Sequence, residues 1–182
     1  MKASALVYCE NEFGNIDGKV ANGLIRQSEI YKVLGIIDSS KAGKDAGECL
    51  DGIKNGIPIF KNIESALKEL KRIPQYFIYG IAALTSFLSN KQKEVIFSAM
   101  KSGMNIINGM PEFLNDNVQF RNTALKYGVT IQDVRKPPAR ENLHNFTGCI
   151  HDVKIPIITV MGTDCAVGKR TTALLLVEAL RN

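Results

Sequence analysis

A loop bounded by glycines and closed by a lysine stands near the end of the sequence, between an apolar run and a leucine-rich run. The loop starts at Gly162 and ends at Gly168 and Lys169. In such loops, backbone N–H groups and the N-terminus of the following helix attract an anion, and the lysine adds positive charge. The pattern therefore predicts a phosphate-binding loop. The residues expected to contact the cofactor are Gly162, Thr163, Asp164, Cys165, Ala166, Val167, Gly168, Lys169, Arg170 and Thr171.

The spacing of this loop differs from the common one. The common loop has four residues between its glycines and a Ser or Thr directly after the lysine, whose hydroxyl holds Mg²⁺. Here five residues lie between Gly162 and Gly168, and Arg170 follows the lysine. Thr171 lies about 100° further round the helix, so it replaces that ligand only if the loop shifts. We therefore expect a bound phosphate and a doubtful Mg²⁺ site, with Arg170 either adding charge or remaining solvated.

Few other residues have a type and spacing that suit catalysis or metal binding. Asp164 is a candidate general base by position alone. Backbone N–H groups could lower the pKa of the Cys165 thiol, although a small loop-filling residue is the favoured interpretation. The cysteines are scattered, which predicts reduced thiols. His144 and His151 have no acid or thiol at ligand spacing, so no metal site is predicted.

Alternating strand and helix patterns precede the phosphate loop. A helix–Gly–strand step occurs twice, at residues 101–104 and 126–129, as in a doubly wound α/β domain. The predicted fold is therefore α/β, a Rossmann-like doubly wound parallel sheet followed by the first strand, P-loop and helix of a second α/β domain. The expected strands are 4–9, 31–37, 57–60, 76–81, 104–107, 129–134 and 155–161; the expected helices are 18–27 (capped by Asp17), 63–70 (capped by Asn62), 91–102, 117–127 and one from Lys169 onward.

A break in periodicity separates two predicted domains. Paired prolines at 137–138 make the segment after residue 134 stiff and extended. We predict a Rossmann-like domain over 1–134, a linker over 135–153 and the start of a P-loop NTPase-like domain over 154–182. One strand and one helix cannot bury their own apolar faces. We therefore expect the second domain to be truncated and the chain to be a fragment of a longer polypeptide.

Charged residues that follow the predicted strands are candidate substrate ligands, because loops at the carboxyl ends of parallel strands line the ligand crevice. Two lysines around a glycine after the second strand could bind an anion or could simply be solvated. The aspartate ending that strand suits a ribose-binding acid by position, but the first turn lacks Gly-x-Gly-x-x-Gly, so a turn aspartate is the favoured interpretation. A basic pair at the domain boundary could face the phosphate loop. These candidates are Asp38, Lys41, Lys44, Arg135 and Lys136.

The overall charge and hydropathy narrow the class of partner. The net charge is +5, and the basic residues are spread out without an aromatic-interleaved stripe, which favours an anionic small molecule over nucleic acid. No apolar run reaches the length of a membrane span, and the first residues lack a signal-peptide pattern. We expect a cytoplasmic homo-oligomer without a membrane partner.

Four segments of the sequence resemble a two-domain bacterial and archaeal family long catalogued as uncharacterised, with a Rossmann-like N-terminal half and a P-loop NTPase-like C-terminal half. These segments are residues 37–47, 109–114, 133–138 and 162–169. The phosphate loop is also similar to that of dethiobiotin synthetase, which shares the five-residue spacing but has Thr where this chain has Arg170. Some family members are D-glutamate N-acetyltransferases that use acetyl-CoA, which implies a phosphate loop that holds CoA without hydrolysis. Members of the family are well beyond 182 residues long.

Three functions remain open from the sequence. The first is an N-acetyltransferase with acetyl-CoA at the phosphate loop and an acidic amino acid near Lys41, Lys44 or Arg135. The second is an ATP-dependent ligase or kinase with Lys169 on the β- and γ-phosphates. The third is a non-catalytic binding or assembly domain.

Overall fold

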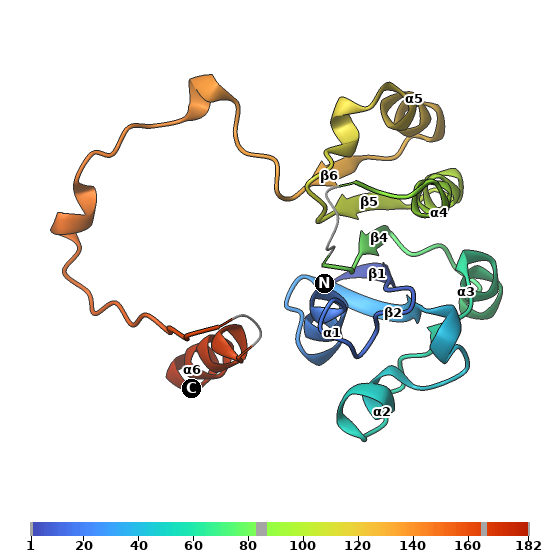
Figure 1. Ribbon diagram of the computed structural model, residues 1–182, viewed down its shortest axis with the longest axis horizontal. Coiled ribbons are helices and arrows are strands. Elements are labelled where there is room, and N and C mark those ends of the chain that lie inside the picture. Colours follow the sequence, from blue (N-terminus) through green and yellow to red (C-terminus); the bar gives the residue numbers. More distant parts are fainter. Residues whose placement is uncertain (1, 83–86, 165–166, 182) are drawn as a thin grey trace. The chain divides into compact units, whose positions relative to one another are not determined.

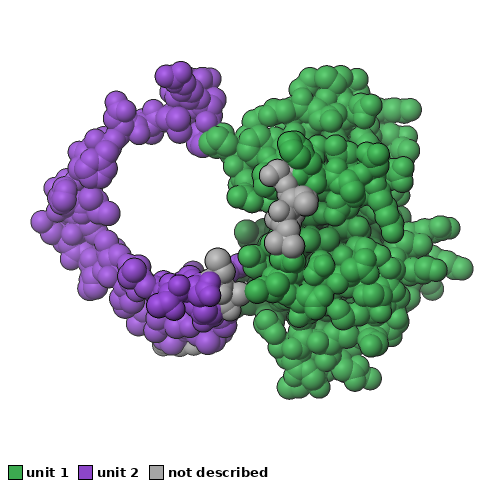
Figure 2. Space-filling model, viewed as in Figure 1, with its two compact units in different colours: residues 1–137 green, residues 138–182 purple. Residues whose placement is uncertain are grey.

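The computed structural model describes residues 2–82, 87–164 and 167–181. The chain divides into two compact units, Met1–Pro137 and Pro138–Asn182 (Figure 2). Unit 1 contains the sheet, and unit 2 contains an irregular segment and a helix.

All six strands of unit 1 are parallel and form one sheet (Figure 1). The strand order is β3-β2-β1-β4-β5-β6, which is the order of a doubly wound dinucleotide-binding fold. The two directions of winding separate between β1 and β4, so this is the topological switch point of the sheet. The predicted Rossmann-like α/β fold is confirmed. The strands are β1 (Ala3–Tyr8), β2 (Tyr31–Ile37), β3 (Ile59–Phe60), β4 (Tyr76–Tyr79), β5 (Asn105–Asn108) and β6 (Ile131–Asp133).

Helices cover both faces of this sheet. On one face, Ala21 and Ala46 pack with strand residues such as Val7 and Ile78; on the other, Ile96 and Phe120 lie in the larger cluster. Consecutive strand residues point to opposite faces, so uninterrupted apolar strands supply both clusters. The helices are α1 (Lys19–Arg26) and α2 (Ala46–Asp51) on the first face, and α3 (Ile63–Leu70), α4 (Asn90–Lys101) and α5 (Val118–Tyr127) on the second.

The ends of these helices follow the sequence closely, with one exception. Asn62 accepts a hydrogen bond from the N–H of Ser65 at 2.8 Å, and Gly128 ends α5 in the left-handed region at φ 64°. Both residues were predicted at these ends, and Asn62 is confirmed as a cap. The predicted Asp17 cap of α1 is wrong: the N-cap is Gly18, with no side-chain hydrogen bond. The backbone carbonyl of Asp17 accepts the N–H of Ala82 at 2.7 Å, so Asp17 is bonded to the loop after β4.

Unit 2 contains two short 3₁₀ turns (Arg140–Asn142 and Cys149–Asp152) and α6 (Lys169–Arg181). The predicted helix from Lys169 is confirmed. The strand predicted over 155–161 is not formed, and Ile155 and Ile157 are 74% and 65% exposed. A parallel strand needs a neighbouring strand to bond its backbone, and the described part of unit 2 contains none. Across the described residues, every helix is too short or too polar to span a membrane.

Candidate functional site

The predicted phosphate loop curls back on the side chain of its lysine. The Lys169 ammonium donates a hydrogen bond to the carbonyl of Asp164. At Gly162, an added Cβ would lie 2.8 Å from Val167 Cγ2 and 2.9 Å from Lys169 Cγ. A side chain at Gly162 would therefore collide with the end of the loop, which explains why a glycine begins it. Gly168 has φ 90°, in the left-handed region, just before α6 begins.

The polar groups of this loop suit an anion. Within the described residues, Lys169 makes no ion pair, and its ammonium is held only by a neutral carbonyl that a phosphate oxygen can replace. The loop precedes a 13-residue helix, whose N-terminal dipole favours negative charge. Thr163, Asp164, Val167, Arg170 and Thr171 are exposed, and Gly168 and Lys169 are half-buried. The predicted ligands Cys165 and Ala166 lie outside the described residues.

Asp38 is fully buried at the end of β2 and closes the loop between β1 and α1. Its Oδ1 accepts the N–H groups of Asn11 (3.2 Å) and Ser40 (3.0 Å), and its Oδ2 accepts the N–H of Phe13 (3.2 Å). These bonds use the backbone donors that a dinucleotide-binding turn would turn toward pyrophosphate. The geometry agrees with the interpretation of Asp38 as a turn aspartate.

The two candidate lysines after β2 have different environments. The Lys41 ammonium donates to the carbonyl of Phe13, so it belongs to the same closed loop as Asp38. Lys44 is exposed, and its backbone carbonyl accepts the N–H of Ile59 at 3.0 Å. Of these two lysines, Lys44 is therefore the one whose ammonium makes no hydrogen bond to the described residues.

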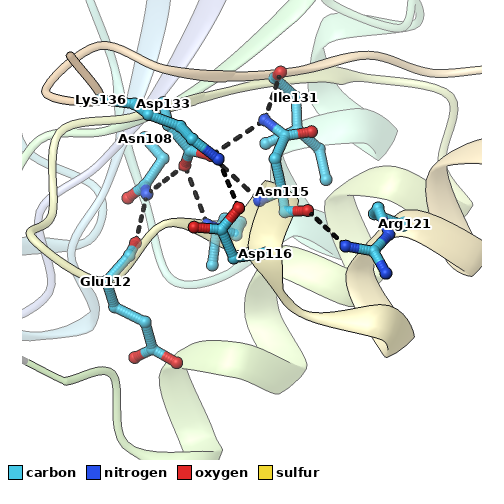
Figure 3. Close-up of polar contacts among 9 residues, drawn as sticks. Asn108, Glu112, Asn115, Asp116, Arg121, Ile131, Asp133 and Lys136 are labelled. Carbon is cyan, nitrogen blue, oxygen red and sulfur yellow. Dashed lines mark hydrogen bonds and ion pairs between the residues drawn. The ribbon is translucent and has the colours of Figure 1, made fainter. Parts of the chain in front are cut away.

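A buried polar network joins the carboxyl ends of β5 and β6 (Figure 3). Asn108 Nδ2 donates to Asp133 Oδ1 at 2.7 Å and to the carbonyl of Glu112 at 2.8 Å. Asp133 also accepts the N–H groups of Leu114 and Asn115, each at 3.0 Å, and the Asn115 side-chain amide at 2.9 Å. With four donors, the Asp133 carboxylate is saturated, so it fixes the loop and leaves no lone pair directed at a ligand.

The same network sets the pKa of Asp133. Burial raises this pKa, but the hydrogen bonds from Asn108, Asn115 and Leu114 stabilise the charged form, and the net effect lowers it. We did not predict this network, because its members come from separate segments. The only sequence signal is position: Asn108 directly follows the strand predicted over 104–107, and Asp133 lies near the end of the strand predicted over 129–134.

The candidate residues Arg135 and Lys136 follow directly on β6. Lys136 forms an ion pair with Asp116 (Figure 3). Its ammonium also lies 5.7 Å from the centre of the Phe113 ring. Arg135 is exposed, and the part of the chain that the structure describes offers it no ion-pair partner. Lys136 therefore anchors the segment, and Arg135 is the residue of the pair with a charge available to a ligand.

The sheet separates the candidate substrate residues into two groups. Asp38 and Lys41 follow β2, whereas Arg135 and Lys136 follow β6. Three strands, β1, β4 and β5, lie between them. At about 4.8 Å per strand, the two groups are roughly 19 Å apart along the carboxyl edge. The structure does not bring them together around one small ligand.

Three of the cysteines lie in the described residues, and Cys9, Cys49 and Cys149 are free there. Burial, followed by the nearby charge of Asp38, raises the pKa of the Cys9 thiol to about 12. This thiol therefore remains protonated and is a poor nucleophile. The described residues contain no group of three or more His, Cys, Asp or Glu side chains arranged to hold a metal ion.

Two sequence families and several known proteins match this chain. A Rossmann-like domain of unknown function, DUF1611_N, matches residues 39–137, and the P-loop domain of unknown function DUF1611_C matches residues 144–182. Proteins named D-glutamate N-acetyltransferase from Pseudoalteromonas sp and Tritonibacter scottomollicae are each 30% identical, over 58% and 61% of this chain. The chain spans only 30% and 32% of their length.

A solved structure of similar fold agrees with the family match. The crystal structure of a DUF1611 family protein from Anabaena variabilis has a TM-score of 0.86 and 30% sequence identity, over 99% of this chain and 50% of its own. The Rossmann-like match alone covers more than half of the sequence. The chain therefore belongs to the DUF1611 family, with its Rossmann-like domain followed by P-loop domain sequence.

Proposed function

We propose that this protein is an N-acetyltransferase that transfers an acetyl group from acetyl-CoA to D-glutamate or a similar acidic amino acid. The geometry of the phosphate loop is the observation that supports it most: Lys169 is held by a neutral carbonyl and is available to a phosphate. The names of the two curated relatives support the reaction type. Arg170 in place of the usual Mg²⁺-binding hydroxyl supports CoA rather than hydrolysable ATP.

In this proposal the loop holds the phosphates of CoA through its N–H groups and Lys169. The substrate amine attacks the thioester carbonyl, a carbon–nitrogen bond forms, the carbon–sulfur bond breaks, and CoA leaves as its thiol after the amine gives up a proton. Acceleration would come mainly from holding the amine and the thioester together. Asp164 is a candidate acceptor of that proton by position alone.

The P-loop match favours one alternative, an ATP-dependent ligase or kinase. Such an enzyme would place Lys169 on the β- and γ-phosphates and would require Mg²⁺. Thr171 is exposed on the first turn of α6 and is the hydroxyl that would have to reach this ion.

Calorimetry separates these functions. We expect acetyl-CoA to bind without Mg²⁺, and Lys169→Ala to weaken that binding at least ten-fold, because one charge-assisted contact is worth about 1.5–3 kcal/mol. Lys154→Ala, which removes another exposed lysine of unit 2, is the control and should bind as the parent does. Binding of ATP that requires Mg²⁺, without binding of acetyl-CoA, would favour the ligase or kinase. Unchanged binding by Lys169→Ala would exclude the loop as the site.

A further inference from the structure

An open groove lies between α4 and α5, where the two helices run side by side on one face of the sheet (Figure 1). Its volume is about 450 Å³. Phe97 of α4 stacks on the buried Phe120 of α5, with 4.3 Å between the ring centres, so the two walls are firmly joined. The lining residues are Glu94, Phe97, Ser98 and Lys101 from α4 and Gln119 and Thr123 from α5.

Two opposite charges of α4 stand in this groove, seven residues apart. Glu94 and Lys101 are exposed, and neither takes part in an ion pair among the described residues. Seven residues are close to two helical turns, so the two side chains share a face and are about 10.5 Å apart along the axis. A partner that lies along α4 therefore satisfies both charges if it carries the opposite pair at the same separation.

A second copy of the same helix carries that pair. In a two-fold symmetric interface, residue i of one copy contacts residue j of the other, and j contacts i. The midpoint between Glu94 and Lys101 falls between Phe97 and Ser98. Antiparallel packing about an axis at this point places Glu94 of each copy beside Lys101 of the other, so two ion pairs form at once.

The other residues of this face are compatible with such packing. Ser98 is exposed and small, which lets a second helix approach closely at the centre of the face. Gln119 and Thr123 are uncharged, so the wall formed by α5 adds no unpaired charge. Lys91 lies one turn before Glu94, opposite the end of the other copy's α4, where the helix dipole favours a positive charge.

We propose that α4 and α5 form the interface of a homodimer, in which α4 of each copy lies antiparallel in the groove of the other. Glu94 pairs with Lys101 across the two-fold axis. The charge pattern favours a second copy over an unrelated protein, because the face is its own complement about its midpoint. This interface does not depend on the proposed acetyl transfer.

Charge reversal tests the proposal, with the mass of the full chain measured by sedimentation velocity over a series of concentrations. Glu94→Lys and Lys101→Glu each place two like-charged pairs across the axis, so each should weaken dimerisation at least about ten-fold. An equal mixture of the two variants brings opposite charges together at both positions and should restore the dimer. Glu69→Lys, at an exposed position of α3, is the control and should associate as the parent does.

A parent chain that is monomeric at every concentration would overturn the proposal and leave the groove to a different partner. Unchanged dimerisation of both single variants would also overturn it, because the contact would then lie on another surface. If both variants are monomeric and their mixture is monomeric too, the reversals act by damaging α4 and not by repulsion across an axis, which contradicts the proposal. The unfolding temperature of each variant, followed by circular dichroism, measures such damage directly.

Discussion

The loops before α1 and α6 differ in the partner that each gives to its hydrogen-bond donors. In unit 1, the loop before α1 gives the N–H groups of Asn11 and Phe13 to the buried carboxylate of Asp38. In unit 2, the loop before α6 holds the Lys169 ammonium on the neutral carbonyl of Asp164. A ligand anion can replace a carbonyl at Lys169, but it cannot readily replace a buried carboxylate. A loop of this kind can therefore bind a ligand anion only if no carboxylate of the protein already occupies its donors, as Asp38 does in the first loop.

The largest effect should come from removing that internal anion. Asp38→Ala leaves the N–H groups of Asn11 and Ser40 without their carboxylate acceptor and leaves the N–H of Phe13 only its bond to the Cys9 carbonyl. The loss should lower the free energy of unfolding by roughly 3 kcal/mol. Denaturant unfolding followed by circular dichroism measures this loss. Asp38→Asn retains an acceptor oxygen and should lose less. Equal stability of the parent and Asp38→Ala would show that the first loop does not depend on this carboxylate.

The second prediction concerns the other buried carboxylate of the carboxyl edge. The pKa of Asp133 is lowered in the folded protein, so its contribution to stability is present above the unfolded pKa of about 3.9 and is lost as pH falls through the folded pKa. Asp133→Asn should lower stability by about 2 kcal/mol at pH 7 and should reduce the loss of stability below about pH 4. Unfolding curves measured from pH 7 to pH 2 would contradict this account if the parent and the variant lost stability in parallel.

A smaller effect is expected from a side chain at the start of the open loop. Gly162→Ala places a Cβ against Val167 and Lys169, so the loop must uncurl. Acetyl-CoA binding should weaken about ten-fold, whereas the unfolding of unit 1 should not change. Gly109→Ala is the matched control, because a Cβ there meets only the Tyr79 carbonyl at an ordinary 3.9 Å. Calorimetry in which both variants bind equally well would argue against the curled loop.

The smallest effect concerns a surface ion pair between the last residues of α1 and α2. Arg26 of α1 and Asp51 of α2 lie 2.6 Å apart, but both side chains are about half exposed. Exposed pairs contribute roughly 0.2–1 kcal/mol. Arg26→Ala should therefore reduce the free energy of unfolding by less than about 1 kcal/mol in chemical denaturation, and added salt should reduce the difference. A loss of unfolding free energy as large as that of Asp38→Ala would contradict this account. It would mean that the surface ion pair stabilises α1 as much as the packing of its Ala21 on Gly80 and the hydrogen bonds of Asp38 do.

Local patterns predicted most of the fold. Tyr31–Ile37 was predicted with both ends correct, and Asn62 and Gly128 marked helix ends through their own backbone preferences. The short helix α2 was missed, because Ala46–Asp51 is too short to show a helical period. The strand predicted over 155–161 depends on hydrogen bonds from another strand, which an apolar pattern cannot supply.

The candidate sites were harder to predict than the fold. The loop from Gly162 to Lys169 is contiguous, so its spacing could be recognised from the sequence. The saturation of Asp133 by Asn108 and Asn115 depends on contacts between separate strands and loops. No spacing rule along the chain encodes them.

Backbone amide NMR during a titration with acetyl-CoA tests the contrast between the two loops most directly. We predict that the N–H signals of residues 167–172 shift with increasing ligand, whereas those of Asn11 and Phe13 do not, because their N–H groups remain on Asp38. Shifts at Asn11 and Phe13 without shifts around Lys169 would contradict the account.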